Sequence, residues 1–133
     1  MDRNFLRVID ANANRCREAM RVCEDIVRFI RHDKRTAEEL KRIRHALEKD
    51  VRSLPLSYRT LLAARDSAND VGREMVLFPA KRKRETDDIF IRNMKRAQEA
   101  ARVLEECAKP LARSASRRFQ RLRFRLYEAE KKH

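Results

Sequence analysis

The stretch NANRCREAMRVCED at residues 12–25 is echoed by NMKRAQEAARVLEE at residues 93–106. Seven of the fourteen positions are identical: Asn12/Asn93, Arg15/Arg96, Glu18/Glu99, Ala19/Ala100, Arg21/Arg102, Val22/Val103 and Glu24/Glu105. A second echo follows each copy, because LKRIRHAL at 40–47 resembles FQRLRFRL at 119–126. Neither pair of helices could bury its apolar face alone. The repeat therefore predicts an all-α, four-helix bundle built from two similar helical hairpins about a pseudo-two-fold axis.

Apolar residues recur with helical spacing in four segments, which we expect to be helices over about 7–31, 37–52, 86–109 and 114–131. A capping box of Thr36 and Glu39 should start the second helix. One domain would then cover 1–133, with hairpins at 7–52 and 86–131 and a long connection at 53–85. A short helix is expected across SYRTLLAAR. Apolar residues of the connection need cover, which predicts a homodimer: Leu61, Leu62, Val76, Leu77 and Phe78.

The formal net charge of +13 and the isoelectric point near 10.5 favour an anionic partner. Nucleic acid, a membrane surface or a phosphorylated small molecule would each suit it, and so would a merely solvated basic surface. No run approaches the roughly 18 apolar residues that span a bilayer. Asp2, Arg3 and Arg7 interrupt the place where a signal peptide would be apolar. We therefore expect a cytoplasmic protein without a membrane partner.

The three cysteines, Cys16, Cys23 and Cys107, are odd in number and lie on expected helices. Cys16 and Cys23 fall on the apolar stripe, so we interpret them as small buried hydrophobic residues in a reducing compartment. The sequence has no CxxC motif, and its histidines lack metal-ligand spacing. We expect no structural metal.

Several repeated polar residues fall on or beside the apolar faces. With roughly 100° per residue, Asn12 and Arg15 share an arc with Cys16, and Arg44 lies beside the stripe of the second helix. The repeat gives Asn93, Arg96 and Arg123 equivalent positions. Glu18 and Glu99, at spacing i, i+3 from the arginines, could neutralise part of the charge.

Buried charge needs a partner, and any excess of arginine inside the bundle would suit a phosphate. The sequence therefore predicts an internal anion site. The alternative is structural: the arginines lay their stems along the seam with the guanidinium in water, and the asparagines only fix helix register.

The segment ARDSANDVG (64–72) supplies Arg65, Asp66 and Asp70 beside Gly72, the only glycine. Carboxylates near phosphates suit Mg²⁺ binding or general-base work. Alternatively they only form turns and helix caps.

A basic surface keeps nucleic-acid binding as an alternative. It comprises KRKR at 81–84 and the arginines at 113, 117, 118, 121, 123 and 125, with little aromatic interleaving. The chain has no glycine-rich phosphate loop. A nucleotide would therefore be bound by side chains on helices.

The motifs RVIDANANRCREAMRVCEDIVRFI, LKRIRHAL, ARDSANDVG and RNMKRAQEAARVLEE resemble the small all-helical domain often fused N-terminally to bacterial thiamin-phosphate synthase. The resemblance spans most of the chain in the same order. It implies an alternative hydroxymethylpyrimidine phosphate kinase, which uses ATP to convert 4-amino-5-hydroxymethyl-2-methylpyrimidine phosphate to its pyrophosphate. The chain is too short for the barrel of the synthase.

The resemblance carries over eleven residues: Asn12, Arg15, Glu18, Arg21, Arg65, Asp66, Asp70, Asn93, Arg96, Glu99 and Arg102. Our candidate catalytic residues are Glu18, Asp66, Asp70 and Glu99, and our candidate substrate-binding residues are Asn12, Arg15, Arg44, Arg65, Asn93, Arg96 and Arg123. The amides would pair with the aminopyrimidine, the arginines with phosphate, and Asp66 or Asp70 with Mg²⁺. The competing hypotheses are a nucleic-acid-binding protein and a non-catalytic partner of a thiamin-phosphate synthase.

Overall fold

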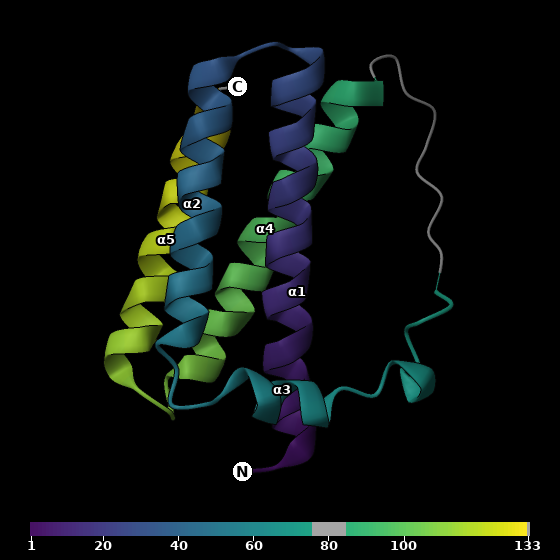
Figure 1. Ribbon diagram of the computed structural model, residues 1–133, viewed down its shortest axis with the longest axis vertical. Helices are drawn as coiled ribbons and strands as arrows, with labels where there is room; N and C mark the ends of the chain where they lie inside the picture. The colour runs from purple at the N-terminus through teal and green to yellow at the C-terminus, as the bar shows by residue number, and fades with distance from the viewer. Residues whose placement is uncertain (76–84, 133) are drawn as a thin grey trace.

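Within residues 1–75 and 85–132, which the computed structural model describes, the chain is helical and has no strand. The long helices are α1 (Arg3–Asp25), α2 (Lys34–Arg52), α4 (Glu85–Ala108) and α5 (Arg113–Lys131). α1 packs against α2 and α4, and α5 packs against the same two helices (Figure 1). The all-α prediction is confirmed. The relation between two similar hairpins stays a prediction.

The turn between α1 and α2 is tighter than the sequence indicated. α1 continues into a π-helical turn, η1 (Ile26–Ile30), and His32 then adopts a left-handed backbone conformation with φ of 53°. Asp33 caps α2, because its carboxylate accepts the backbone N–H of Thr36 at 3.1 Å.

The predicted capping box of Thr36 and Glu39 is therefore wrong. Asp33 lies three residues before Thr36 and fills the N-cap position itself. The carboxylate of Glu39 instead accepts a hydrogen bond from Lys132, 93 residues along the chain.

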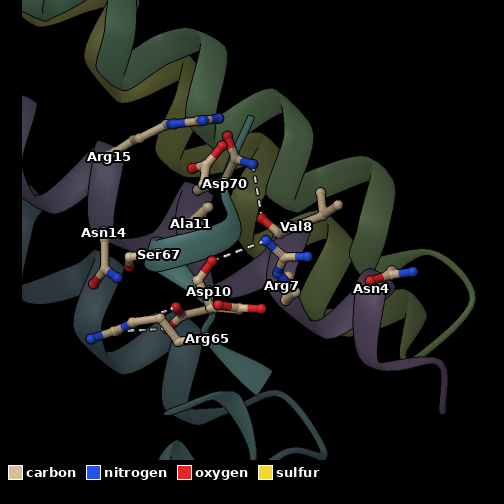
Figure 2. A pocket seen from close by; sticks show the side chains of 12 residues that line it. Asn4, Arg7, Val8, Asp10, Ala11, Asn14, Arg15, Arg65, Ser67 and Asp70 are labelled. Carbon is tan, nitrogen blue, oxygen red and sulfur yellow. Dashed lines mark hydrogen bonds and ion pairs between the residues drawn. The ribbon is translucent and has the colours of Figure 1, made fainter. Parts of the chain in front are cut away.

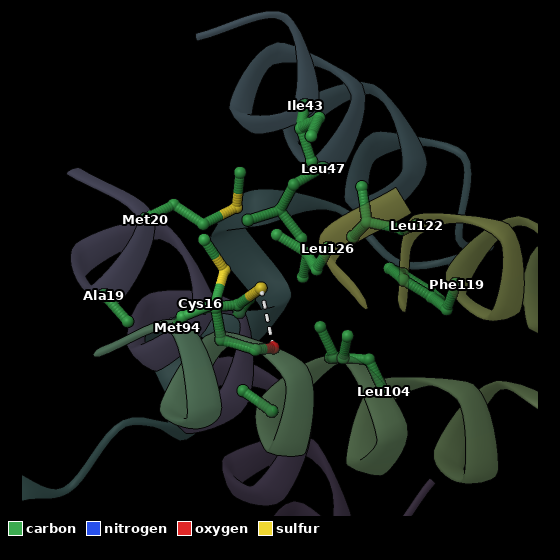
Figure 3. Close-up of a cluster of buried hydrophobic side chains, with 14 of the residues drawn as sticks. Cys16, Ala19, Met20, Ile43, Leu47, Met94, Leu104, Phe119, Leu122 and Leu126 are labelled. Atoms are coloured by element: carbon green, nitrogen blue, oxygen red, sulfur yellow. Dashed lines mark hydrogen bonds between the residues drawn. The ribbon is translucent and has the colours of Figure 1, made fainter. Parts of the chain in front are cut away.

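A core of apolar side chains from all four long helices fills the space between them (Figure 3). Cys16 and Cys23 are fully buried, and their thiols donate to the backbone carbonyls of Ala97 at 3.4 Å and Phe90 at 3.5 Å. Burial raises the pKa of both thiols to about 12. The prediction that these two cysteines are buried is confirmed, and α1 and α4 approach closely where they lie.

Two pairs of neighbouring long helices, α1 with α2 and α4 with α5, are each joined by a largely buried ion pair. Arg44 of α2 binds Glu24 of α1 through two hydrogen bonds of 2.6 and 3.2 Å. Arg123 of α5 donates to Glu105 of α4 at 2.9 Å and to the Tyr127 hydroxyl at 3.0 Å. Hydrogen bonding to these partners raises the pKa of each arginine above its ordinary value. These guanidiniums are committed to holding helices together.

The short helix α3 (Tyr58–Ala64) confirms the helix expected in the connection, and it crosses the N-terminal part of α1 (Figure 1). Leu61 is 4% exposed within the chain and needs no partner, whereas Leu62 is 43% exposed. Val76, Leu77 and Phe78 lie outside the described residues, as does KRKR at 81–84. The homodimer stays a prediction.

None of the helices in the described part of the chain combines the length and apolar character that a bilayer crossing requires.

The two adjacent leucines of α3 provide a test of how this helix is held. We expect Leu61→Ala to lower the free energy of unfolding by about 2–5 kcal/mol, because it leaves a cavity between α3 and α1. Leu62→Ala should change it by less than about 1 kcal/mol. Urea denaturation measures both. Equal effects would show that α3 is not anchored through Leu61.

The buried thiols should resist alkylation. With a pKa of about 12, only about one thiol in ten thousand is ionised near pH 8, and the thiolate is the reactive form. Cys107 is half-buried, so iodoacetamide should modify it first in the folded protein. Mass spectrometry reads out the order, with urea-unfolded protein as the control in which all three react alike. Native labelling of Cys16 as fast as Cys107 would contradict the structure.

Candidate functional site

A cleft of about 520 Å³ opens where the N-terminal half of α1 meets the segment after α3 (Figure 2). Its volume lies in the range typical of small-molecule sites. We call it the α1–α3 cleft. Most of the residues that line it are polar, and they come from two separate parts of the chain: Asn4, Arg7, Val8, Asp10, Ala11, Asn12, Asn14, Arg15, Arg65, Asp66, Ser67 and Asp70.

One wall of the cleft depends on an ion pair between Asp10 and Arg65. Asp10 is only 6% exposed, and both its carboxylate oxygens accept hydrogen bonds of 2.8 Å from the Arg65 guanidinium. This hydrogen bonding raises the pKa of Arg65 above its ordinary value. A two-point contact of this kind fixes the plane of the guanidinium. Arg65 is thereby held at the cleft edge.

The segment from 66 to 70 is fixed by a second contact with α1. Arg7 donates from Nη2 to the backbone carbonyl of Asp66 at 3.2 Å. The Asp66 carboxylate caps the short 3-10 helix η2 (Ser67–Asn69) by accepting from Asn69, and the Asn69 side chain holds the pKa of Asp66 below its usual range. Asp66 therefore stays ionised and is largely occupied as a cap.

Asn12 and Asp70 each keep one oxygen available. Asn12 is 5% exposed and donates from Nδ2 to the carbonyl of Val8 at 2.8 Å, which leaves its Oδ1 without a donor among the described residues. Asp70 accepts the Gly72 N–H at Oδ1, and its Oδ2 has no donor within the same part of the chain. Both residues line the cleft. They present acceptors to any ligand there.

A smaller cavity of about 180 Å³ lies on the seam between α1 and α4. We call it the α1–α4 groove; Arg15, Glu18, Ala19, Val22, Asn93 and Arg96 line it. Arg15 lines both cavities, so the groove adjoins the cleft. Asn93 donates from Nδ2 to the carbonyl of Ile89 at 2.8 Å.

The prediction that Arg15 and Arg96 face the bundle interior is wrong, because both are exposed. The buried stripe of α1 is centred nearer Cys16 and Met20 than Asn12, which places Arg15 roughly 100° from that centre at 100° per residue. The site therefore lies on the outside of the α1–α4 seam. Asn12 is buried, as predicted, and Asn93 is half-buried.

The structure gathers most of the predicted site residues and separates three of them. Asn12, Arg15, Arg65, Asp66 and Asp70 meet at the cleft, and Glu18, Asn93 and Arg96 meet at the groove. Arg44 and Arg123 line neither cavity and are paired with carboxylates. Glu99 is exposed and also lines neither.

Sequence reasoning missed Asp10 and Arg7. Asp10 lies on the side of α1 opposite Asn12, where helical spacing indicates solvent. It is buried because α3 packs over that side. Asp10 and Arg65 are 55 residues apart, and no sequence pattern indicates that they form an ion pair.

The chain offers little for a resident metal. Among the described residues, no three His, Cys, Asp or Glu side chains come together in a way that could hold a metal ion. Mg²⁺, however, commonly binds through one or two carboxylates together with phosphates of the substrate. Asp70, with its available oxygen, fits that role better than Asp66, which is used as a cap.

The fold and the site define the chain as a small all-helical protein with an arginine-rich surface cleft. Residues 7–132 match the ThiD2 family. The chain therefore belongs to the ThiD2 family.

Longer relatives carry a similar segment. A thiamine-phosphate synthase of Synechocystis sp. is 36% identical over 124 residues, which cover 93% of this chain and 34% of the relative. That of Thermosynechococcus vestitus is 36% identical over 127 residues, with coverage of 93% and 34%, and that of Rhodopirellula baltica is 31% identical over 125, with 94% and 33%. The chain thus spans about a third of these relatives. No solved structure shows significant similarity to it.

Removing Arg65 should lower the free energy of unfolding more than removing Asp10. Arg65→Ala leaves a buried carboxylate without its partner and should lower the free energy of unfolding by about 1–3 kcal/mol. Asp10→Ala frees an arginine that can turn to water, so it should cost less. The double variant should cost less than the sum. Urea denaturation of the four proteins gives the coupling energy, and strictly additive costs would contradict the pairing.

Proposed function

We propose that this chain acts in thiamin biosynthesis by binding hydroxymethylpyrimidine phosphate in the α1–α3 cleft and phosphorylating it with ATP. The observation that carries the proposal is convergence. Asn12 and Arg15 on α1 meet Arg65, Asp66 and Asp70, fifty or more positions later in the sequence, at a single cleft of ligand size. Membership of the ThiD2 family and the names of the longer relatives support the pathway.

The cleft offers complementary groups to both ends of such a substrate. The Asn12 Oδ1 can accept a hydrogen bond from the amino group of an aminopyrimidine, since Nδ2 already donates to Val8. Arg15 has no carboxylate partner among the described residues and can bind the phosphate. Arg65 keeps its second terminal nitrogen uncommitted, since Asp10 takes the other two.

The chemistry asks for charge neutralisation more than for proton transfer. An oxygen of the substrate phosphate attacks the γ-phosphorus of ATP, the bond to the β–γ bridging oxygen breaks, and ADP leaves with that electron pair. The attacking oxygen is already ionised near neutral pH, because a phosphate monoester has a second pKa of about 6. No general base is therefore required, and the proposal gives Glu18 and Glu99 no such role. Arginines that neutralise and orient the phosphates supply the main effect.

Mg²⁺ bound with ATP would neutralise phosphate charge, and Asp70 would hold it, with Asp66 close by in sequence. The chain itself orients Asp70, because the Gly72 N–H donates a hydrogen bond to Oδ1 of its carboxylate and leaves Oδ2 available.

We further propose that the four long helices form a bundle of two similar hairpins related by a pseudo-two-fold axis. Equivalent contacts support it: the Glu24–Arg44 and Glu105–Arg123 ion pairs occupy matching positions of the repeated sequence. In the same way, Asn12 donates to Val8 and Asn93 to Ile89, each four residues back. Arg15 and Arg96 are then counterparts that meet at the α1–α4 groove.

A second candidate function rests on α5. Arg113, Arg117, Arg121 and Arg125 are exposed and recur every four residues, so they share one face of this helix. Such a row suits the phosphates of a nucleic acid. Binding of that kind would weaken steeply as salt rises and would not depend on Arg15.

Calorimetry with hydroxymethylpyrimidine phosphate tests the first proposal. We expect Arg15→Ala to weaken binding about 10- to 100-fold, because it removes a charged hydrogen bond to phosphate. Arg42→Ala is the matched control: Arg42 is exposed on α2, lines neither cavity and carries the same charge. Formation of ADP and pyrimidine pyrophosphate, followed by mass spectrometry, tests the transfer itself.

Three results would contradict the proposal. These are absence of binding to the unaltered protein, an equal loss in Arg15→Ala and Arg42→Ala, or binding without any ATP-dependent product. The last would leave a binding protein without the proposed transfer.

A further inference from the structure

The α1–α4 groove is lined by two arginines from different helices, Arg15 of α1 and Arg96 of α4. Among the described residues, neither Arg15 nor Arg96 forms an ion pair, whereas Arg44, Arg65 and Arg123 each bind a buried acid. Glu18 also lines the groove and leaves a net charge of about one positive unit there. Two like charges facing one concave surface repel each other, and an anion between them removes that cost.

The dimensions of the groove limit what that anion can be. At about 180 Å³ it is well below the volume of the α1–α3 cleft and below the range usual for sites that enclose a whole small molecule. Its lining includes the small and apolar Ala19 and Val22. It can accept a phosphate chain, while a nucleoside would have to lie outside it.

The groove and the cleft share one residue. Arg15 lines both cavities, so groups bound in the two places would lie beside the same residue. A planar guanidinium with five N–H donors can bind two phosphates at once. Asn93 is oriented beside it, because its Nδ2 is fixed on the Ile89 carbonyl and its Oδ1 is left as an acceptor.

We propose that the α1–α4 groove is the subsite for the phosphate chain of a nucleoside triphosphate, held between Arg15 and Arg96, with Arg15 bridging to the phosphate in the cleft. The identity of the anion as a phosphoryl donor rests on the proposed function. The existence of an anion site at the groove does not, because it follows from two unpaired arginines that line the same small cavity. Arg96 is thus assigned to the donor and not to the pyrimidine.

Binding of sodium tripolyphosphate, of ATP and of hydroxymethylpyrimidine phosphate, each measured separately by calorimetry, tests the assignment. Arg96→Ala should weaken tripolyphosphate and ATP roughly 10- to 100-fold and leave the pyrimidine phosphate unchanged. Arg15→Ala should weaken all three. Arg92→Ala is the matched control, because Arg92 is exposed on the same helix and lines neither cavity. Arg96 is exposed, so its loss should not disturb folding, and thermal unfolding checks this.

The outcomes separate the two proposals. If Arg96→Ala and Arg92→Ala weaken tripolyphosphate equally, binding follows net charge and the groove is not a site. If Arg96→Ala weakens the pyrimidine phosphate as much as the polyphosphate, the division into two subsites is wrong. If the unaltered protein binds tripolyphosphate through Arg96 but does not bind the pyrimidine phosphate, the groove stands and the proposed function fails.

Discussion

The ion pair between Asp10 and Arg65 is the contact on which the cleft depends. α3 takes the Asp10 carboxylate out of water, and such a burial is tolerated only when a partner compensates for the lost hydration. Arg65 is that partner, and it comes directly after α3. The same interaction therefore makes the burial of Asp10 possible and pins the segment that carries Asp66 and Asp70 onto α1. Without it, the packing of α3 on α1 and the hydrogen bond from Arg7 to the Asp66 carbonyl would have to hold the two walls of the cleft together.

Two pairs of arginines at matching positions of the repeat have different environments, and the difference is whether an acid binds them. Arg44 and Arg123 meet Glu24 and Glu105 across a helix pair, where charge and hydrogen bonding are both satisfied. Arg15 and Arg96 meet no acid that binds them within the described residues, and both lie in hollows. The first pair stabilises the fold. The second pair is the one to which we assign phosphate binding in our proposal, because no acid binds either arginine within the described residues.

Much of the helical architecture could be predicted from the sequence, because apolar residues repeat with a period of 3.6 along each long helix. α4 and α5 begin and end within about one or two residues of prediction. The sequence predicted which residues form the candidate site better than it predicted where they lie in the fold. Asn12, Arg15, Arg65 and Asp70 could be named from their motifs, but the sequence could not show that α3 covers Asp10. It also could not fix the centre of the buried stripe closely enough to place Arg15 outside.

The close approach of α1 and α4 at Cys16 has a consequence for the surface above it. The Cys16 thiol lies 3.4 Å from the backbone carbonyl oxygen of Ala97, and both residues are fully buried. A side chain larger than that of Cys16 or Ala97 would therefore not fit between α1 and α4 at this point. The buried residues Cys16 and Ala97 therefore set the distance between the two helices that carry Arg15 and Arg96. A bulkier residue at Ala97 would spread the helices and widen the groove while leaving every lining side chain intact. A substitution in the core would therefore change which length of anion fits the groove, without changing any residue that lines it.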